Sequence, residues 1–290
     1  MTQESRCALL VVSCDAYADL WPPFFSLLRR HWPDCPFPIY LGTGENSAAP
    51  EGITVLRSAG GRDWSRCAAD YLDALPQPYV LMMLDDFFLR RAVNNRDLMH
   101  CLRFAQEKQA VQLRLIPRPK PTERLAGEAL IGACAAGTPY RLSTQAAIWD
   151  RKKLRALLAA NESIWEFELN GNHRADAHSA GFFSVWKPVL PYNGLLAHHV
   201  VEKGKWLPHE KWVFGRQKIG CDFSRRDTLS WRYALFYQAV QATSQLLGLL
   251  PPAFNRRTKQ RIKSFLHPLL GTQFSRLRGP SAQSTKRDGP

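Results

Sequence analysis

The first half of the chain alternates between continuous apolar runs and segments with helical spacing. Residues 8–13 and 79–84 are unbroken apolar runs, which are typical of strands buried on both faces of a sheet. Shorter apolar segments predict further strands at residues 38–42, 53–56 and 110–116. Apolar residues that recur every three or four positions predict helices over residues 20–32, 64–75 and 96–107. This alternation predicts an α/β/α sandwich with a Rossmann-like, mostly parallel central sheet.

Polar residues follow several of these predicted strands. Ligands bind an open parallel sheet at the carboxyl ends of its strands. Residues 13–15, Thr43 with Gly44, and Asp85 with Asp86 therefore form one candidate surface. Neither GxGxxG nor GxxxxGK[ST] follows the first strand, which disfavours a dinucleotide-binding fold and a P-loop enzyme.

The two adjacent carboxylates at Asp85 and Asp86 terminate the most apolar predicted strand. Carboxylates at the end of a buried strand are costly unless they are paired or bound to a cation. A hard ion such as Mg²⁺ or Mn²⁺ would take one or two of them together with substrate phosphates. The alternative is structural: Asp85 caps the next turn and Asp86 pairs with Arg90 or Arg91.

A second acidic segment lies further along the chain. Residues 141–149 predict a strand and residues 150–160 the helix after it. Residues 162–168 read Glu-Ser-Ile-Trp-Glu-Phe-Glu, and in an extended conformation Glu166 and Glu168 point to the same side. A carboxylate beside aromatic rings can serve as a general base, and we prefer Glu168 for that role. The alternative is a half-exposed amphipathic edge.

The positive charge is concentrated at the C-terminal end. Residues 211–290 hold 15 Lys and Arg against three Asp, a balance of +12 out of the total of +14. Apolar and basic residues interleave there, which favours attachment to an anionic membrane surface over nucleic-acid binding. The alternative is a helix packed on the domain with a solvated basic end. The last residues, 279–290, have the composition of a disordered tail.

Other features of the composition limit where the protein acts. The longest apolar runs fall far short of the ~20 residues that span a bilayer, and the N-terminus lacks the pattern of a signal peptide. The seven cysteines include no CxxC pair, so we expect reduced thiols and no structural zinc site. We expect a cytoplasmic protein.

The order of these segments resembles that of a known enzyme family. The shared features are a first strand ending near Asp15, Gly-Arg-Asp-Trp at residues 61–64, Asp-Asp-Phe-Phe at 85–88, Tyr-Arg-Leu-Ser-Thr-Gln-Ala-Ala-Ile-Trp at 140–149, and Trp-Glu-Phe-Glu at 165–168. Over about residues 7–215 the chain resembles GT-A-fold glycosyltransferases, of the bacterial kind that build surface polysaccharides. The usual Asp-x-Asp motif of that family appears here as Asp-Asp-Phe.

The resemblance implies a nucleotide-sugar donor and a role for each matched residue. A carboxylate after Trp165 would be the base, and His199 would add a late metal or phosphate contact. Adjacent residues of a strand face opposite ways, so at most one of His198 and His199 can serve. The implied donor-binding residues are Asp15, Arg62, Trp64, Asp85 and Gln145, and the implied ligands of Mg²⁺ or Mn²⁺ are Asp86 and His199.

These observations together predict an enzyme that transfers a sugar to a hydroxyl of a glycan or lipid-linked acceptor at the inner face of the membrane. Direct displacement with inversion is the simpler chemistry for these residues. We expect a transferase domain over 1–215, a basic amphipathic extension over 216–278 and a disordered tail over 279–290. The alternatives are a metal-dependent nucleotidyltransferase on a similar sheet and, outside the enzymes, a basic nucleic-acid-binding module.

Overall fold

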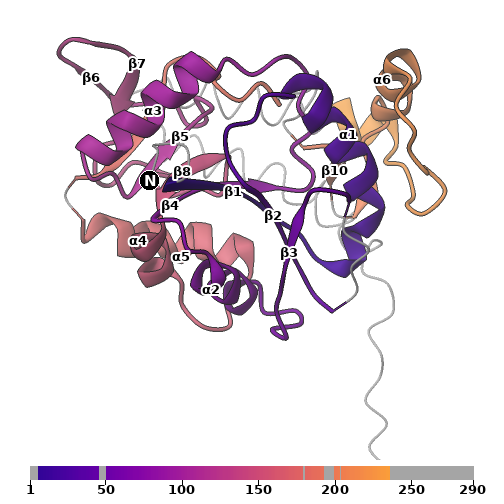
Figure 1. The fold of residues 1–290 in the computed structure, drawn as a ribbon, viewed down its shortest axis with the longest axis horizontal. Coiled ribbons are helices and arrows are strands. Elements are labelled where there is room, and N and C mark those ends of the chain that lie inside the picture. Colours follow the sequence, from indigo (N-terminus) through magenta and orange to yellow (C-terminus); the bar gives the residue numbers. More distant parts are fainter. Residues whose placement is uncertain (1–5, 46–49, 179, 193–198, 203, 236–290) are drawn as a thin grey trace, which may run out of the picture. The chain divides into compact units, whose positions relative to one another are not determined.

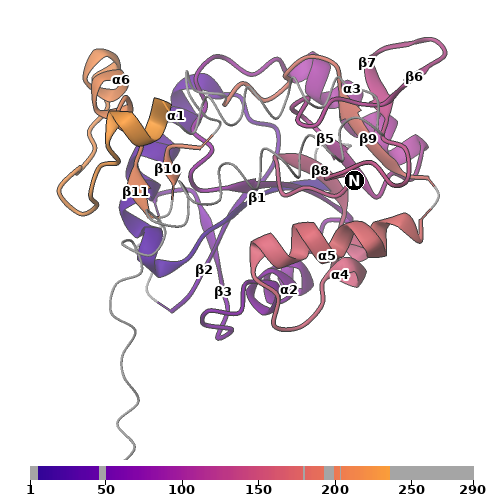
Figure 2. The same ribbon diagram turned by 180° about the vertical axis from the view of Figure 1, so that it is seen from behind.

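The computed structural model describes residues 6–45, 50–178, 180–192, 199–202 and 204–235 (Figures 1 and 2). The chain divides into a unit that spans Met1–Leu229 and a second unit, Ser230–Pro290. The predicted tail at 279–290 and most of the basic extension lie outside the described residues. In the part that is described, no helix is long and apolar enough to cross a membrane.

The first unit is built on one large mixed sheet. Within the described residues, seven of its nine strands run in one direction, and β7 and β8 run the opposite way. The strand order is β3 (Thr54–Arg57), β2 (Ile39–Thr43), β1 (Cys7–Val12), β4 (Tyr79–Leu84), β8 (Ala147–Asp150), β5 (Gln112–Arg114), β9 (Phe182–Val185), β7 (Glu128–Ala133), β6 (Glu123–Leu125). A separate antiparallel pair is formed by β10 (Val201–Glu202) and β11 (Lys205–Trp206).

Helices cover both faces of this sheet (Figure 1). Alternate residues of β1 point to opposite faces, so Leu9 and Val11 join one apolar cluster while Ala8 and Leu10 join the other. The first cluster contains α1 (Trp21–His31) and α3 (Asn95–Glu107); the second contains α2 (Trp64–Ala74), α4 (Arg151–Leu157) and α5 (Ile164–Asp176). This arrangement confirms the expected α/β sandwich with a mostly parallel sheet.

The local pattern predicted the elements of the first half closely. The three helices expected at residues 20–32, 64–75 and 96–107 are α1, α2 and α3, and the apolar run at 79–84 is β4. Each of the three helices begins and ends within one residue of its predicted limits.

Two expectations for the second half are wrong. Residues 162–168 are not extended: they lead into α5, whose first turn is closed by a capping box between Ser163 and Glu166. The strand expected at 141–149 is shorter, because only β8 joins the sheet and the residues before it bond to α5 instead.

The compact unit also extends beyond the boundary expected at residue 215. Helix α6 (Glu210–Gln217) spans that position. After it, Trp206 N donates to Asp227 O at 2.8 Å and Leu229 N donates to Trp206 O at 2.9 Å. Residues up to Leu229 are therefore held by β11 and belong to the first unit.

Candidate active site

One edge of the sheet brings together most of the expected site residues. The strands β1, β2 and β4 are parallel, so the residues that follow Val12, Thr43 and Leu84 meet at this edge. Since β8 is antiparallel to β4, the residue that comes just before it, Ala146, lies at the same edge. This edge therefore carries four of the expected site residues, namely Asp15, Asp85, Asp86 and Gln145.

Asp85 is held in a buried hydrogen-bonded chain at the end of β4. Only 6% of Asp85 is exposed. Its Oδ2 accepts a hydrogen bond from Ser13 Oγ, and Ser13 Oγ in turn accepts one from Trp21 Nε1 at 2.7 Å. Burial raises the pKa of Asp85 well above its usual value, and the charge of Asp86 raises it further. Trp21 fixes the orientation of Ser13 through this bond. The sequence pattern did not indicate this role for Trp21.

Asp86 is the second carboxylate at the end of β4. Its Oδ1 is buried and has no hydrogen-bond partner among the described residues. Burial raises the pKa of Asp86 to about 6, although the nearby charge of His199 lowers it. The structural alternative was an ion pair of Asp86 with Arg90 or Arg91. Arg90 Nη2 instead donates to both carboxylate oxygens of Glu210 at 2.7 Å, and Arg91 is exposed.

His199 lies beside this carboxylate. Val200 N donates to Asp86 O at 3.1 Å, which brings the segment before β10 to the end of β4. His199 Nε2 is 3.0 Å from Glu202 Oε2. Burial lowers the pKa of His199, but the bond to Glu202 and the charge of Asp86 outweigh burial, and the pKa is raised.

The donor set fits a cation that is bound together with a phosphate ligand. No group of three or more His, Cys, Asp or Glu side chains that could hold a metal occurs among the described residues. Mg²⁺ bound with a diphosphate needs only one or two protein ligands, and the orphaned Oδ1 of Asp86 is one available oxygen.

A cavity of about 400 Å³ opens beside the loop after β1. That loop forms the short 3-10 helix η2 (Asp15–Leu20). Asp15 Oδ1 accepts a hydrogen bond from Thr43 Oγ1 at 2.7 Å, which ties η2 to the end of β2. The lining also includes Arg226, whose Nε and Nη2 donate to the two oxygens of Asp19 at 2.7 and 2.6 Å. No local sequence signal pointed to Arg226, because its partner lies 207 residues away.

Gln145 is positioned from both sides. Tyr192 Oη donates to Gln145 Oε1 at 3.0 Å, and the tyrosine ring stacks on Phe87 with centroids 4.7 Å apart. Because Phe87 directly follows Asp86, this stack connects Gln145 to the Asp pair. On the other side, Glu168 Oε1 accepts hydrogen bonds from Thr144 N at 2.6 Å and Thr144 Oγ1 at 2.7 Å.

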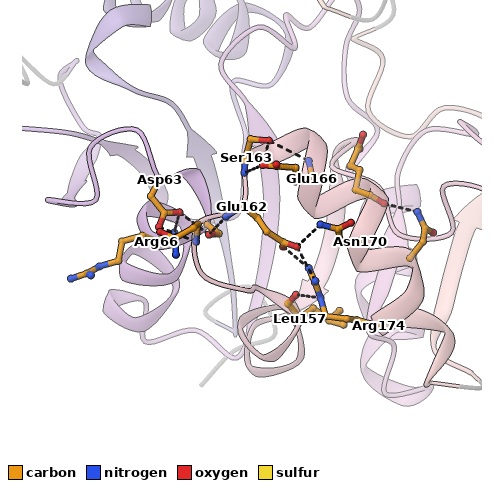
Figure 3. A network of polar contacts seen from close by, with 12 residues as sticks. Asp63, Arg66, Leu157, Glu162, Ser163, Glu166, Asn170 and Arg174 are labelled. Atoms are coloured by element: carbon orange, nitrogen blue, oxygen red, sulfur yellow. Dashed lines mark hydrogen bonds and ion pairs between the residues drawn. The ribbon is translucent and has the colours of Figure 1, made fainter. Parts of the chain in front are cut away.

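The two candidate bases therefore differ in their surroundings. Glu168 is 9% exposed and contacts the segment that carries Gln145, and its Oε2 accepts no hydrogen bond from the described residues. Glu166 lies at the start of α5, where its Oε2 accepts from Ser163 N at 2.8 Å and from Ser163 Oγ at 2.7 Å (Figure 3). Those bonds lower the pKa of Glu166.

The remaining two expected residues lie at the start of α2. Trp64 is its first residue and packs on Phe167 of α5 with ring centroids 5.3 Å apart, within the second apolar cluster. Arg62 is exposed in the turn before the helix. The cap of α2 is Asp63, which accepts a bond from Arg66 N at 3.0 Å (Figure 3). Trp64 thus has a packing role that its sequence context did not reveal.

Comparison with known proteins does not assign the chain to a family. No protein-family model matches the chain, and no curated protein matches it in sequence. Among solved structures, residues 1–349 of TarS from S. aureus match with a TM-score of 0.42 and 13% identity. The match covers 62% of this chain and 57% of that one, so the chain spans less than two thirds of its length. A likeness at this level does not establish a shared activity.

Proposed function

We propose that the protein is a GT-A-type glycosyltransferase that moves a sugar from a nucleoside-diphosphate sugar to a hydroxyl acceptor. The observation that carries this proposal is the buried Asp85–Asp86 pair at the carboxyl end of β4, where Asp86 Oδ1 has no partner among the described residues. A cavity of about 400 Å³, lined by Asp15, opens beside the loop after β1. A buried carboxylate oxygen without a donor is costly unless a ligand or cation completes its surroundings.

The proposed roles follow the order of the strands. Asp15, Arg62 and Trp64 lie on the β1 to β3 half of the sheet and would bind the nucleoside. Asp85 and Gln145 would bind the donor nearer the reacting centre. Asp86, with His199, would hold Mg²⁺ or Mn²⁺, which when bound supplies positive charge against the leaving diphosphate.

Glu168 is our proposed general base. Three hydrogen bonds to its Oε1 fix the carboxylate, while Oε2 stays available to take the proton of the acceptor hydroxyl. The hydroxyl oxygen would then attack the anomeric carbon as the bond to the diphosphate breaks, with inversion of configuration. The acceptor would be a glycan or lipid-linked glycan, reached at the cytoplasmic face of the membrane by means of the basic C-terminal region.

The reaction is tested by incubating the protein with labelled nucleotide sugars and Mg²⁺ or Mn²⁺. We expect release of a nucleoside diphosphate, and Asp86→Asn should lower that rate by orders of magnitude without loss of fold. The matched control is Asp73→Asn, an exposed carboxylate on α2 whose partner is Arg155. Consumption of a nucleoside triphosphate with release of pyrophosphate would identify a nucleotidyltransferase instead, and an unchanged rate in chelator would remove the metal.

The base is tested by two amide substitutions. Glu168→Gln keeps an oxygen that can accept the bonds from Thr144 but cannot take up a proton, so turnover should fall while the fold is retained. Glu166→Gln, in the capping box, should stay active. The reverse result would assign the base to Glu166.

A further inference from the structure

Arg118 lies in the loop after β5, at the same edge of the sheet as the Asp pair. Leu115 N donates to Ala146 O at 2.9 Å, which joins the start of this loop to the residue after Gln145. Val189 N donates to Leu115 O at 2.9 Å, which joins the loop to the segment that leads to Tyr192. Arg118 is therefore placed beside the Gln145–Tyr192 pair.

The neighbouring arginine of this strand has all its contacts inside the protein. Arg114 is fully buried, and its Nη1 donates to Arg141 O at 2.7 Å and to Tyr140 O at 3.0 Å. Its Nη2 donates to Pro119 O at 3.3 Å. These bonds hold the loop in place around Arg118, but they leave Arg114 unable to bind a ligand.

Arg118 differs because its guanidinium is uncommitted. The side chain is partly buried and makes no hydrogen bond or ion pair with any described residue. Its charge nevertheless acts on Tyr192, whose pKa is raised mainly by burial and lowered in part by Arg118. Among the residues that the structure does not describe, the only ones with a carboxylate side chain are Glu4 and Asp288, near the two ends of the sequence. A partly desolvated arginine without a carboxylate is poised for an anion from outside.

The position of Arg118 relative to the strands indicates which part of the substrates would carry the anion. The β1 to β3 half carries the proposed nucleoside contacts, β4 carries the Asp pair, and β8 and β5 follow on the other side. Arg118 is thus separated from the nucleoside by the proposed metal and diphosphate position. We propose that Arg118 binds an oxyanion, a phosphate or a carboxylate, carried by the donor sugar or by the acceptor. This specificity rests on the proposed sugar transfer and names the substrate class for it.

The test compares matched neutral and anionic ligands by calorimetry or ligand-detected NMR on the full chain. The donor arm uses UDP-glucose and UDP-glucuronate; the acceptor arm uses glucose and glucose 6-phosphate. In at least one arm the anionic ligand should bind wild type about tenfold more tightly, as expected for a hydrogen bond to a charged group. Arg118→Gln should abolish that preference and leave the neutral ligand unaffected. The matched control is Lys120→Gln, which removes one exposed charge from the same loop and should keep the preference.

Several results would overturn the inference. No anionic preference in either arm of wild type would do so, as would equal weakening of UDP-glucose and UDP-glucuronate in Arg118→Gln, which would place the arginine at the nucleotide. If Arg118→Gln does not fold, Arg118→Lys decides: it keeps the charge without the fork, so a reduced preference upholds the proposal and an unchanged one refutes it. Absence of sugar transfer with an anionic preference intact would defeat the proposed function but not the oxyanion site.

Discussion

Replacing Arg226 with an uncharged residue should destabilise the protein more than breaking an exposed ion pair does. Arg226 and Asp19 have side chains that are only 8% and 7% exposed, and they share two short hydrogen bonds. Arg226 also donates to Ala16 O at 2.6 Å, and its guanidinium lies 4.1 Å from the centroid of the Tyr17 ring. Arg226→Met leaves a buried carboxylate unpaired, and loss of one partner from a buried pair costs about 3–5 kcal/mol.

Urea unfolding of the full chain measures this loss in the free energy of unfolding. In thermal unfolding of a unit of this size, a loss of 3–5 kcal/mol corresponds to a fall of about 6–20 °C in melting temperature. Asp19→Asn should cost a similar amount, and the double variant should cost less than the sum because both buried charges are then gone. As a control, Arg155→Met breaks an exposed pair with Asp73, 3.0 Å apart, and should cost less than about 1 kcal/mol. Equal, small losses of stability in Arg226→Met and Arg155→Met would refute the reasoning. They would mean that residues 222–229 do not contribute to the stability of the compact unit.

Three further predictions concern packing, pH and the C-terminal region. Gly42→Ala would place a Cβ 2.5 Å from the buried ring of Tyr71, so thermal unfolding should show a loss of about 1–3 kcal/mol. The bonds from Arg174 lower the pKa of Glu162 below its usual 4.5 (Figure 3). The stability that Glu162 contributes over Glu162→Gln should therefore be constant above about pH 5 and vanish as the pH falls through the lowered pKa; a difference that grows in acid would contradict this. Deleting residues 251–290 removes nine basic residues and Asp288, so binding to anionic vesicles should fall sharply, in a salt-dependent manner, while turnover on a short soluble acceptor persists.

The parts of the fold that follow from local spacing were predictable from sequence. The strands β1 and β4 are buried along almost their whole length, so their apolar runs are continuous and their limits clear. Helices α1, α2 and α3 each bury one face, which produces the spacing that identified them. The rule that ligands bind at carboxyl ends then placed Asp15, Asp85 and Asp86 together without knowledge of the strand order.

Residues 162–168 show where local reading failed. Alternating Trp, Glu, Phe and Glu imitate a strand, but among residues 164–168, which begin α5, the buried ones are Phe167 and Glu168, which are adjacent in sequence. Burial of a glutamate hides the apolar stripe on which helix prediction depends. The Ser163-x-x-Glu166 spacing of a capping box was the available signal for the helix. The bonds of Glu168 to Thr144, like that of Arg226 to Asp19, are contacts across the fold that no local pattern encodes.

Burying the adjacent carboxylates Asp85 and Asp86 is unfavourable for folding, and the hydrogen bonds and charges around them offset this only in part. Ser13, which Trp21 holds in place, donates to one oxygen of Asp85, but Asp86 Oδ1 has no donor among the described residues. The positive charges of His199 and Arg226 lower the pKa of Asp86, yet burial still holds it near 6. An amide at this position would relieve the repulsion between neighbouring carboxylates, so folding stability does not explain two acids here. Asp86 follows β4 at the edge where β1 and β2 also end, and it is there that we propose that a cation or the donor completes the surroundings of this oxygen.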